Sequence, residues 1–240
     1  MGAPLFHATL TRSRELTPSV RAFTFARDDG AAMQFVAGQW VNVMIPTPEG
    51  VLKRAYSVAS PPGPSPEFEL AVTHVAGGAG SKSLHDMSPG ISLEFTEPQG
   101  FFVRKEDHPS LFIATGTGIT PLLSMARHAL DSGDKSPMTM LVGVRHEEDR
   151  LYAAELMALE HAHPQFRAHY TLSQPHQNAP LQGHVQLHLP RLYRELCEQA
   201  GGAKAHIYIC GLEKMVKSVR EVCKGELELT REWIHSERYD

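Results

Sequence analysis

Apolar and polar residues alternate in short runs through the first hundred residues of the chain. Such alternation places every second side chain on one face of an extended segment and therefore predicts β-strands. The predicted strands cover residues 20–25, 40–45, 55–60, 68–73 and 91–95. Because clusters of glycine and proline separate these strands, we expect a small antiparallel β-barrel.

The pattern changes near residue 107. A continuous apolar run predicts a buried strand at residues 110–114, and a second buried strand is predicted at 138–144. Residues 166–172 and 205–210 are expected to be further strands, and helices are predicted at residues 122–130, 151–161, 189–199 and 213–223. Because strands alternate with helices here, we expect an α/β domain with a doubly wound parallel sheet. The sequence thus predicts two domains, residues 1–105 and residues 106–240.

Composition narrows the setting of the protein. The 240 residues are 42% hydrophobic and 21% charged, as in ordinary globular proteins, and no apolar run reaches the about 20 residues of a membrane span. A net charge of −4 argues against binding nucleic acid. Three widely spaced cysteines, Cys197, Cys210 and Cys223, fit reduced thiols. We expect a cytoplasmic, monomeric protein with no metal site and no membrane association.

The segment Arg54-Ala55-Tyr56-Ser57 combines residue types that bind nucleotides. On a strand, Arg54 and Tyr56 point to the same face and Ser57 to the other. The guanidinium offers a fork of donors for phosphate, the phenol ring a surface for stacking, and the serine a hydroxyl for a hydrogen bond. An ordinary barrel strand with a surface arginine and a half-buried tyrosine would show the same pattern.

Glycine-rich turns mark two further candidates. Three glycines precede Ser81, which we expect to cap a short helix whose first N–H groups suit a phosphate, although a plain hairpin loop explains the glycines equally well. The other turn follows the first parallel strand, at the usual place for a nucleotide pyrophosphate, and Pro121 is expected at the first helical position. This turn comprises Thr115, Gly116, Thr117, Gly118, Ile119, Thr120 and Pro121, which is not a G-x-G-x-x-G fingerprint.

Two final segments carry weaker signals. Cys210-Gly211 ends a predicted parallel strand, at the edge where such sheets bind ligands. A lone cysteine is more often a small buried apolar residue. The C-terminal residues Glu237 and Tyr239 lie in a tail of a kind that is usually frayed surface.

Taken in order, these segments resemble the ferredoxin–NADP⁺ reductase family over essentially the whole chain. The motifs are Phe35-Val36-Ala37-Gly38-Gln39, Arg54-Ala55-Tyr56-Ser57, Gly78-x-x-Ser81, Glu97-x-x-Gly100-Phe101-Phe102, the Gly116 turn, Cys210-Gly211 and Glu237-x-Tyr239. The Gly-Phe-Phe-Val step that begins at Gly100 is similar to that of the compact bacterial branch. The resemblance implies an FAD-binding barrel followed by an NAD(P)-binding domain.

The resemblance also implies roles for single residues. In the barrel, Arg54 would bind the FAD pyrophosphate, Tyr56 would stack on the flavin, and Ser57 would hydrogen-bond near flavin N5. Ala55 would accompany them on the strand. The backbone of Gly80, Ser81, Lys82 and Ser83 would hold the pyrophosphate from the other side.

In the second domain, the 115–121 turn would receive the pyridine nucleotide. By the same resemblance, Cys210 and Gly211 would lie against the nicotinamide, and Glu237 would assist proton and charge balance. Tyr239, in a tail that returns to the flavin, would cover the ring face where the nicotinamide docks.

Two positions depart from the family pattern. Many NADP-using relatives have Ser-Arg after the third parallel strand, whereas this chain has Ser173-Gln174, and His184 stands where the bacterial branch has a second basic residue. Arg145 remains a candidate for the 2′-phosphate, so NADP(H) is favoured over NAD(H). Asp240 replaces a terminal aromatic residue that packs on the adenine side of FAD in bacterial relatives.

Three functions fit these observations. The first is a reductase that exchanges hydride between NADPH and FAD and passes single electrons to a separate ferredoxin or flavodoxin. The second is an NADH-linked FAD reductase of an oxygenase system, or a free-flavin reductase. Glu237-x-Tyr239 favours the first, and Gln174 favours the second. The third, a flavin-binding regulatory subunit without turnover, is opposed by Ser57 and Cys210 being present.

Overall fold

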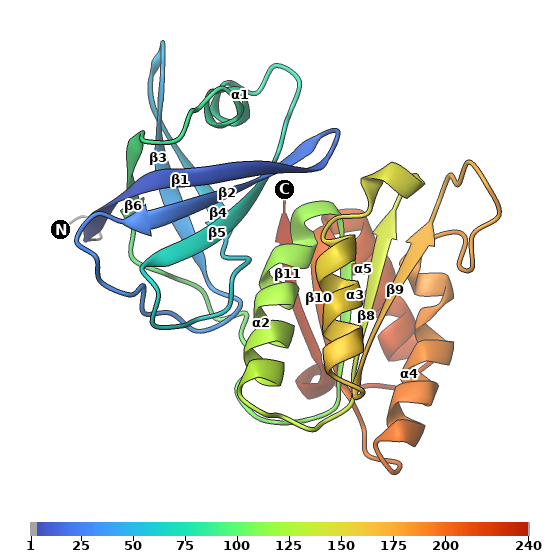
Figure 1. The fold of residues 1–240 in the computed structure, drawn as a ribbon. Helices are drawn as coiled ribbons and strands as arrows, with labels where there is room; N and C mark the ends of the chain where they lie inside the picture. Colours follow the sequence, from blue (N-terminus) through green and yellow to red (C-terminus); the bar gives the residue numbers. More distant parts are fainter. Residues whose placement is uncertain (1–3, 240) are drawn as a thin grey trace. The chain divides into compact units, whose positions relative to one another are not determined.

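The computed structural model describes residues 4–239. Six strands and one short helix form the N-terminal part (Figure 1). They are β1 (Leu5–Thr17), β2 (Val20–Arg27), β3 (Trp40–Thr47), β4 (Gly50–Ser57), β5 (Glu67–Thr73), α1 (Ala79–His85) and β6 (Ser92–Thr96). The strands pair in the order β4-β3-β6-β1-β2-β5, and every pairing is antiparallel.

This sheet curls until its two edge strands approach each other. Val58, directly after β4, forms an isolated bridge with Leu70 on β5, and the Ala59 N–H donates to the Glu69 carbonyl at 2.8 Å. Phenylalanines fill the interior, and the Phe95 ring lies 5.0–5.5 Å from three others, as measured between ring centroids. The expected antiparallel barrel is therefore confirmed as a curled, partly closed sheet.

Two strands of this sheet differ from the sequence expectation. In the first half of β1, the buried apolar residues Phe6, Ala8 and Leu10 alternate with more exposed residues. Charged and polar residues dominate its second half, so no strand was predicted there. The strand predicted at residues 55–60 instead spans Gly50–Ser57, because a tight turn pairs Thr47 with Gly50 and starts β4 earlier. Arg54 thus lies inside the strand.

The second part consists of five strands and four longer helices. They are β7 (Ser110–Thr115), α2 (Ile119–Asp131), β8 (Met138–Val144), α3 (Ala153–Ala162), β9 (Phe166–Leu172), α4 (Leu189–Gln199), β10 (His206–Leu212), α5 (Glu213–Gly225) and β11 (Ile234–Tyr239). The strands are parallel and follow the order β11-β10-β7-β8-β9. Single 3₁₀ turns occur at Gly116–Gly118, Glu147–Asp149, Val185–Leu187 and Arg231–Trp233.

Helices cover both faces of this sheet, so the expectation of a doubly wound fold is confirmed. On one face, Leu111 and Ile209 pack with Leu192 of α4 and Val219 of α5 in one buried cluster. Helices α2 and α3 lie on the other face (Figure 1). Since β7 and β10 are neighbours, the strand order reverses between them, which is where such sheets bind ligands.

Contacts divide the chain into two compact units. The first ends at Arg104 and also takes Leu123–His128 of α2, and the second takes the remainder from Lys105 onward. Among residues 4–239, no helix has both the length and the apolar character needed to cross a membrane.

Candidate active site

In the first unit, the Arg54 to Ser57 segment forms the end of β4, in register with Val43 to Trp40 of β3. The Arg54 side chain is exposed, and its guanidinium donates to the Lys53 carbonyl at 2.9 Å. Tyr56 is half-buried, and burial raises its pKa to about 12, so the phenol stays neutral. Ser57 is buried. An exposed fork of donors thus stands two residues from a neutral aromatic ring.

Helix α1 begins differently from the sequence expectation. Its N-cap is Gly78, and Ser81 lies inside the first turn, so the predicted capping role of Ser81 is wrong. The Ser81 hydroxyl instead accepts the Val75 N–H and donates to the Gly78 carbonyl, both at 3.1 Å. The serine therefore fixes the glycine-rich loop onto the helix that follows it.

The first turn of α1 lies beside Arg54. A methyl group on Gly80 would be 3.7 Å from Cγ of Arg54. Lys82 forms an ion pair with Asp86, and the Ser83 hydroxyl donates to the Pro46 carbonyl at 2.7 Å, so both side chains have structural partners. The backbone N–H groups of a first helical turn have no acceptor within the helix. Together with the guanidinium they make a donor set that fits a diphosphate.

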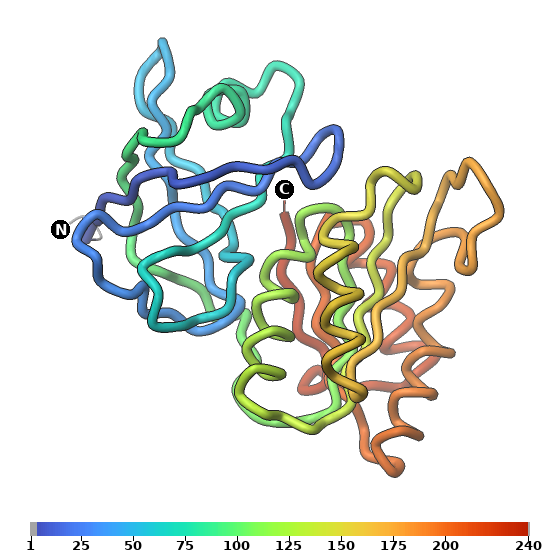
Figure 2. The backbone as a smooth tube through the Cα atoms, viewed as in Figure 1, coloured from blue at the N-terminus to red at the C-terminus, as the bar shows by residue number. Residues whose placement is uncertain are grey.

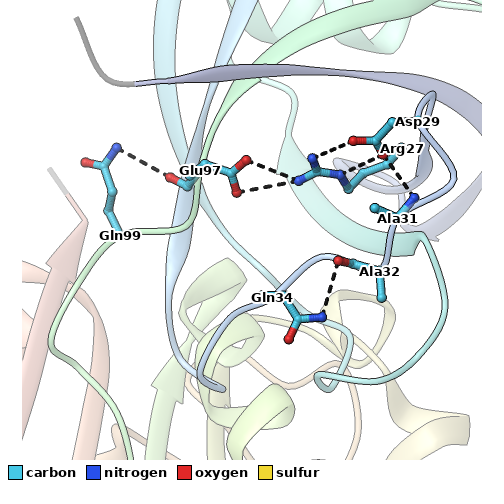
Figure 3. Close-up of polar contacts among 7 residues, drawn as sticks. All are labelled: Arg27, Asp29, Ala31, Ala32, Gln34, Glu97 and Gln99. Carbon is cyan, nitrogen blue, oxygen red and sulfur yellow. Dashed lines mark hydrogen bonds and ion pairs between the residues drawn. The ribbon is translucent and has the colours of Figure 1, made fainter. Parts of the chain in front are cut away.

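The segment from Glu97 to Gly100 is anchored by a largely covered arginine, Arg27 (Figure 3). The Arg27 side chain is 11% exposed, donates to Asp29 at 2.8 Å and to Glu97 at 3.3 Å, and its guanidinium carbon lies 4.2 Å from the centre of the Phe6 ring. The glutamate of the Glu97-x-x-Gly100 motif thus has a structural partner. Gly100 has φ +110°, and a side chain there would collide with the Trp40 indole at 2.9 Å.

In the second unit, the turn after β7 packs backbone against backbone with the end of β10. A methyl group on Gly118 would lie 2.3 Å from the Cys210 carbonyl oxygen, and one on Gly211 would lie 2.3 Å from Oγ1 of Thr115. These contacts explain why glycine is required at positions 118 and 211, since a side chain at either one would collide with a neighbouring atom. Pro121 is the third residue of α2, not the first as predicted, and proline is tolerated there because first-turn N–H groups lack helical acceptors.

Buried polar atoms lie unpaired around this turn. Within residues 4–239, Thr115 Oγ1 and Glu237 Oε2 are buried and have no hydrogen-bond partner. Burial raises the pKa of Glu237 to about 7, and burial likewise raises the pKa of the Cys210 thiol, with Glu237 adding to that effect. Unpaired buried groups are costly unless a ligand meets them. They therefore fit the expectation that a nucleotide binds at this edge.

The C-terminal segment is ordered as strand β11. Glu237 lies in register with Cys210, and Tyr239 with Leu212. The Tyr239 and Thr120 hydroxyl oxygens are 3.4 Å apart. The frayed surface that is usual for a terminal segment is not found at residues 234–239, because parallel pairing with β10 satisfies their backbone groups. Asp240, the other C-terminal prediction, lies outside the described residues.

The loops after β8 and β9 bring the remaining predicted residues together. The Ser173 N–H donates to Val144 at 3.0 Å, and the Gln174 N–H donates to the Arg145 carbonyl at 2.9 Å. The 173–183 loop then returns to β9, where Leu172 forms a bridge with Gln182 just before His184 (Figure 2). Arg145, Ser173, Gln174 and His184 thus all lie near the carboxyl ends of β8 and β9.

Sequence reasoning missed two histidines in these loops. The His146 and His176 rings stack 4.5 Å apart, and Nδ1 of His146 lies 2.5 Å from the Gln174 carbonyl oxygen. Glu147 accepts the backbone N–H of His176 at 3.1 Å. Only their position in the sequence could have marked these histidines as site residues, since each one follows the end of a predicted parallel strand within a few residues.

Known protein families match both units of this chain. A model described as an oxidoreductase FAD-binding domain matches residues 7–103, and one described as an oxidoreductase NAD-binding domain matches residues 112–221. Ferredoxin–NADP reductase B of Sorangium cellulosum is 48% identical over 238 residues, which cover 98% of each chain. The chain belongs to the ferredoxin–NADP⁺ reductase family. It is an oxidoreductase whose two units are an FAD-binding and a nicotinamide-dinucleotide-binding domain.

Other similar proteins differ in length from this chain or match it only in fold. The phenol hydroxylase P5 protein of Acinetobacter pittii is 32% identical over 98% of this chain, which spans 65% of that protein. Among solved structures, a ferredoxin NADP⁺ reductase from Neisseria gonorrhoeae with bound FAD and NADP shares the fold, with a TM-score of 0.79, 21% identity and 99% coverage of both chains. This chain is thus similar both to proteins of its own length and to a part of a longer protein.

Proposed function

We propose that this protein is an FAD-dependent reductase that takes hydride from NADPH and passes single electrons to a ferredoxin or flavodoxin. The observation that carries the proposal is the edge of the second unit, where Thr115 and Glu237 keep unpaired buried atoms beside Cys210. A relative that matches along its whole length and is called a ferredoxin–NADP reductase supports it. Flavin, when bound, supplies the chemistry that accepts two electrons together and releases them singly.

In the first unit, the role of Arg54 is to bind the FAD diphosphate together with the backbone N–H groups of Gly80 and Ser81 in the first turn of α1. The Lys82 N–H already donates to the Gly78 carbonyl at 3.0 Å. The half-buried Tyr56 offers its ring for stacking, and Ser57 a hydroxyl toward the flavin ring. The observation that supports this role is the close approach of Gly80 to the aliphatic part of the Arg54 side chain. It brings the guanidinium group next to the first turn of α1, so that both can bind the same diphosphate.

In the second unit, the 115–121 turn holds the nucleotide, and its glycines let the backbone approach closely. Cys210 stays a neutral thiol because burial raises its pKa, so it presents an apolar, polarisable surface to the nicotinamide. Glu237, with a pKa of about 7, holds or releases a proton at neutral pH. Tyr239 covers the face of the flavin ring on which the nicotinamide docks, and it has to move away before the nicotinamide binds. Its hydroxyl oxygen lies 3.4 Å from that of Thr120.

We assign the preference for NADPH to the ends of β8 and β9. Arg145 is exposed there, its carbonyl accepts the Gln174 N–H, and Ser173 and His184 lie near the same strand ends. A guanidinium binds a phosphate dianion with two parallel hydrogen bonds, a contact that NADH cannot use. We further propose a monomeric, cytoplasmic enzyme.

Stopped-flow reduction of the purified flavoprotein by NADPH and by NADH tests the proposal. Flavin absorbance should bleach faster with NADPH, and Arg145→Ala should lower the apparent affinity for NADPH by about tenfold, a loss of ~1.4 kcal/mol, while leaving NADH unchanged. Lys135→Ala, an exposed cation in the α2–β8 turn, is the control and should change neither coenzyme. A protein that neither nucleotide bleaches would contradict the function.

An NADH-linked reductase of an oxygenase system is the second candidate. Gln174 favours it, because this amide stands where many NADP-using relatives have the arginine that binds the 2′-phosphate. The similarity to the phenol hydroxylase P5 protein supports it as well. Faster bleaching by NADH, with Arg145→Ala without effect on either coenzyme, would move this candidate to first place.

A further inference from the structure

A hollow of about 580 Å³ lies beside the start of strand β11 in the second unit. Arg220 and Lys224 of α5 line it, together with Arg231 from the 3₁₀ turn that precedes the strand. The first residues of β11 complete the wall, namely Ile234, His235 and Ser236. A volume of this size is typical of sites for small molecules.

The cations of this hollow have no acidic partner. None of the described residues that line it is an aspartate or a glutamate. Lys224 and Arg231 form no ion pair within residues 4–239, and Arg220 donates to the neutral Ser236 hydroxyl at 3.0 Å. Burial lowers the pKa of His235, so this ring is neutral at pH 7. Three positive charges therefore share the hollow uncompensated.

Uncompensated charge at this spacing is unfavourable. Arg220 and Lys224 are four residues apart on α5, where like charges repel each other, and Arg231 adds a third positive charge. The adjoining hollow of about 550 Å³, further along α5, differs because Glu213 lines it and accepts from Arg238 at 2.9 Å. The chain has more acidic than basic residues, 27 against 23, so the lack of a partner is local. An anion bound between the three cations removes their repulsion.

The donors of this hollow suit phosphate groups. The guanidinium groups of Arg220 and Arg231 present planar forks of N–H donors that match phosphate oxygens, and the Lys224 ammonium adds a point charge. Strand β11 is the edge of its sheet and pairs with β10 alone, so alternate backbone N–H groups along it have no strand partner. Because a single phosphate group carries at most about two negative charges, three converging cations favour a ligand with more than one such group.

We propose that this hollow binds a small anion that carries a diphosphate group, and that the bound anion ties α5 to the start of β11. The site is distinct from the candidate active site. Ser236 lines the hollow, whereas its neighbour Glu237 points to the other face of the strand, in register with Cys210. The anion thus acts as an effector, since it stabilises the strand that carries Glu237 and Tyr239 without occupying the nucleotide turn. This role is independent of the coenzyme and of the electron acceptor.

Calorimetric titration of the FAD-loaded protein with inorganic pyrophosphate, at constant ionic strength, tests the hollow. The wild type should show saturable binding. The double variant Lys224→Gln, Arg231→Gln should bind pyrophosphate at least about tenfold more weakly, because two of the three charged contacts are lost. Pyrophosphate should also raise the urea midpoint of the wild type but not that of the double variant, since only a ligand of the folded state stabilises it.

Uridine diphosphate is the second probe. Tighter binding of uridine diphosphate than of pyrophosphate would identify a nucleotide as the source of the diphosphate group, and equal binding would show that the diphosphate alone is recognised. Flavin bleaching by NADPH without added pyrophosphate should be normal in the double variant, because neither residue belongs to the candidate active site.

Lys214→Gln is the matched control, since Lys214 is exposed on α5 and lines neither hollow. It should bind pyrophosphate within about twofold of the wild type, because an isolated surface charge contributes little. Equal weakening in Lys214→Gln and in the double variant would show general charge attraction and overturn the proposal. Wild-type protein without saturable binding would overturn it as well. So would binding that excess NADP⁺ abolishes and the double variant retains, because the ion would then occupy the nucleotide site.

Discussion

The two units prepare their candidate sites by opposite means. In the first unit, side chains extend from a strand into the open, as Arg54 does, beside a short helix that supplies backbone donors. In the second unit, close backbone packing shapes the site, since Gly118 and Gly211 let the turn after β7 touch the end of β10. Polar atoms there, such as Thr115 Oγ1, are buried without partners.

This difference predicts opposite sensitivities. Removing a side chain should damage the first site, because the ligand contact is the side chain itself. Adding a side chain should damage the second site, because the space is already filled by a carbonyl group. Each prediction below changes one unit and leaves the other as an internal reference.

The largest effect is expected for Gly118→Ala. Its new methyl group would lie 2.3 Å from the Cys210 carbonyl oxygen, a backbone atom that cannot rotate away. We expect a loss of at least about 2 kcal/mol in the free energy of unfolding, and flavin bleaching by NADPH at least about tenfold slower. Urea unfolding and stopped-flow absorbance measure the two effects.

Gly225→Ala is the matched control, because nothing lies within 4 Å of the methyl group that it adds at the end of α5. It should leave the stability and the reduction rate unchanged. Wild-type stability in Gly118→Ala would show that the two strand ends separate more easily than the close contact indicates.

Arg54→Ala should weaken FAD binding at least about tenfold, because a charge-assisted contact contributes ~1.5–3 kcal/mol. The flavin-to-protein ratio after dialysis and a fluorescence titration with FAD measure the change. Lys53→Ala, the neighbouring exposed cation on the opposite face of β4, should retain FAD. A fully flavinated Arg54→Ala protein would refute the role of this arginine.

Arg27→Ala should destabilise the first unit by about 1–2 kcal/mol, since it removes the contact with the Phe6 ring and the pair with Glu97 (Figure 3). The reduction rate of the flavin that remains bound should not change, because Arg27 contacts structural partners. Lys105→Ala, an exposed cation, controls for the loss of charge. A slower hydride step at full FAD occupancy would place Arg27 in the chemistry instead.

The last prediction is a pH dependence of stability that the wild type shows and Glu237→Gln lacks. The folded carboxyl has a pKa of about 7 against an ordinary value of 4.5, so between these values the folded chain holds a proton that the unfolded chain has lost. Wild-type stability should therefore fall as the pH rises through this window, and the non-titrating variant should escape that fall. Urea unfolding of both proteins at about pH 5 and about pH 8 checks this. A stability difference that is the same at both pH values would show that Glu237 titrates normally.

The central strands β7 and β8 of the second sheet were predicted closely from the sequence because they are buried on both faces. A mostly apolar run marked β8, and the alternation of strands with helices marked β9, both with the bounds that the structure shows. Helical periodicity marked α4. The first sheet was predicted less well, since one face of β1 is polar over much of its length. Strand β11 was missed because its half-buried residues, His235 to Tyr239, give no apolar pattern.

The sequence by itself determined the two-domain order, the glycine turns and the residue types of both candidate sites, because these depend on local periodicity and on backbone freedom. Only the tertiary structure decided which atoms meet. It set Glu237 beside Cys210, left Thr115 Oγ1 unpaired, and gave Ser81 a partner in Val75 instead of a helix cap. Burial and register arise between segments far apart in the chain, and a local pattern holds no information about them.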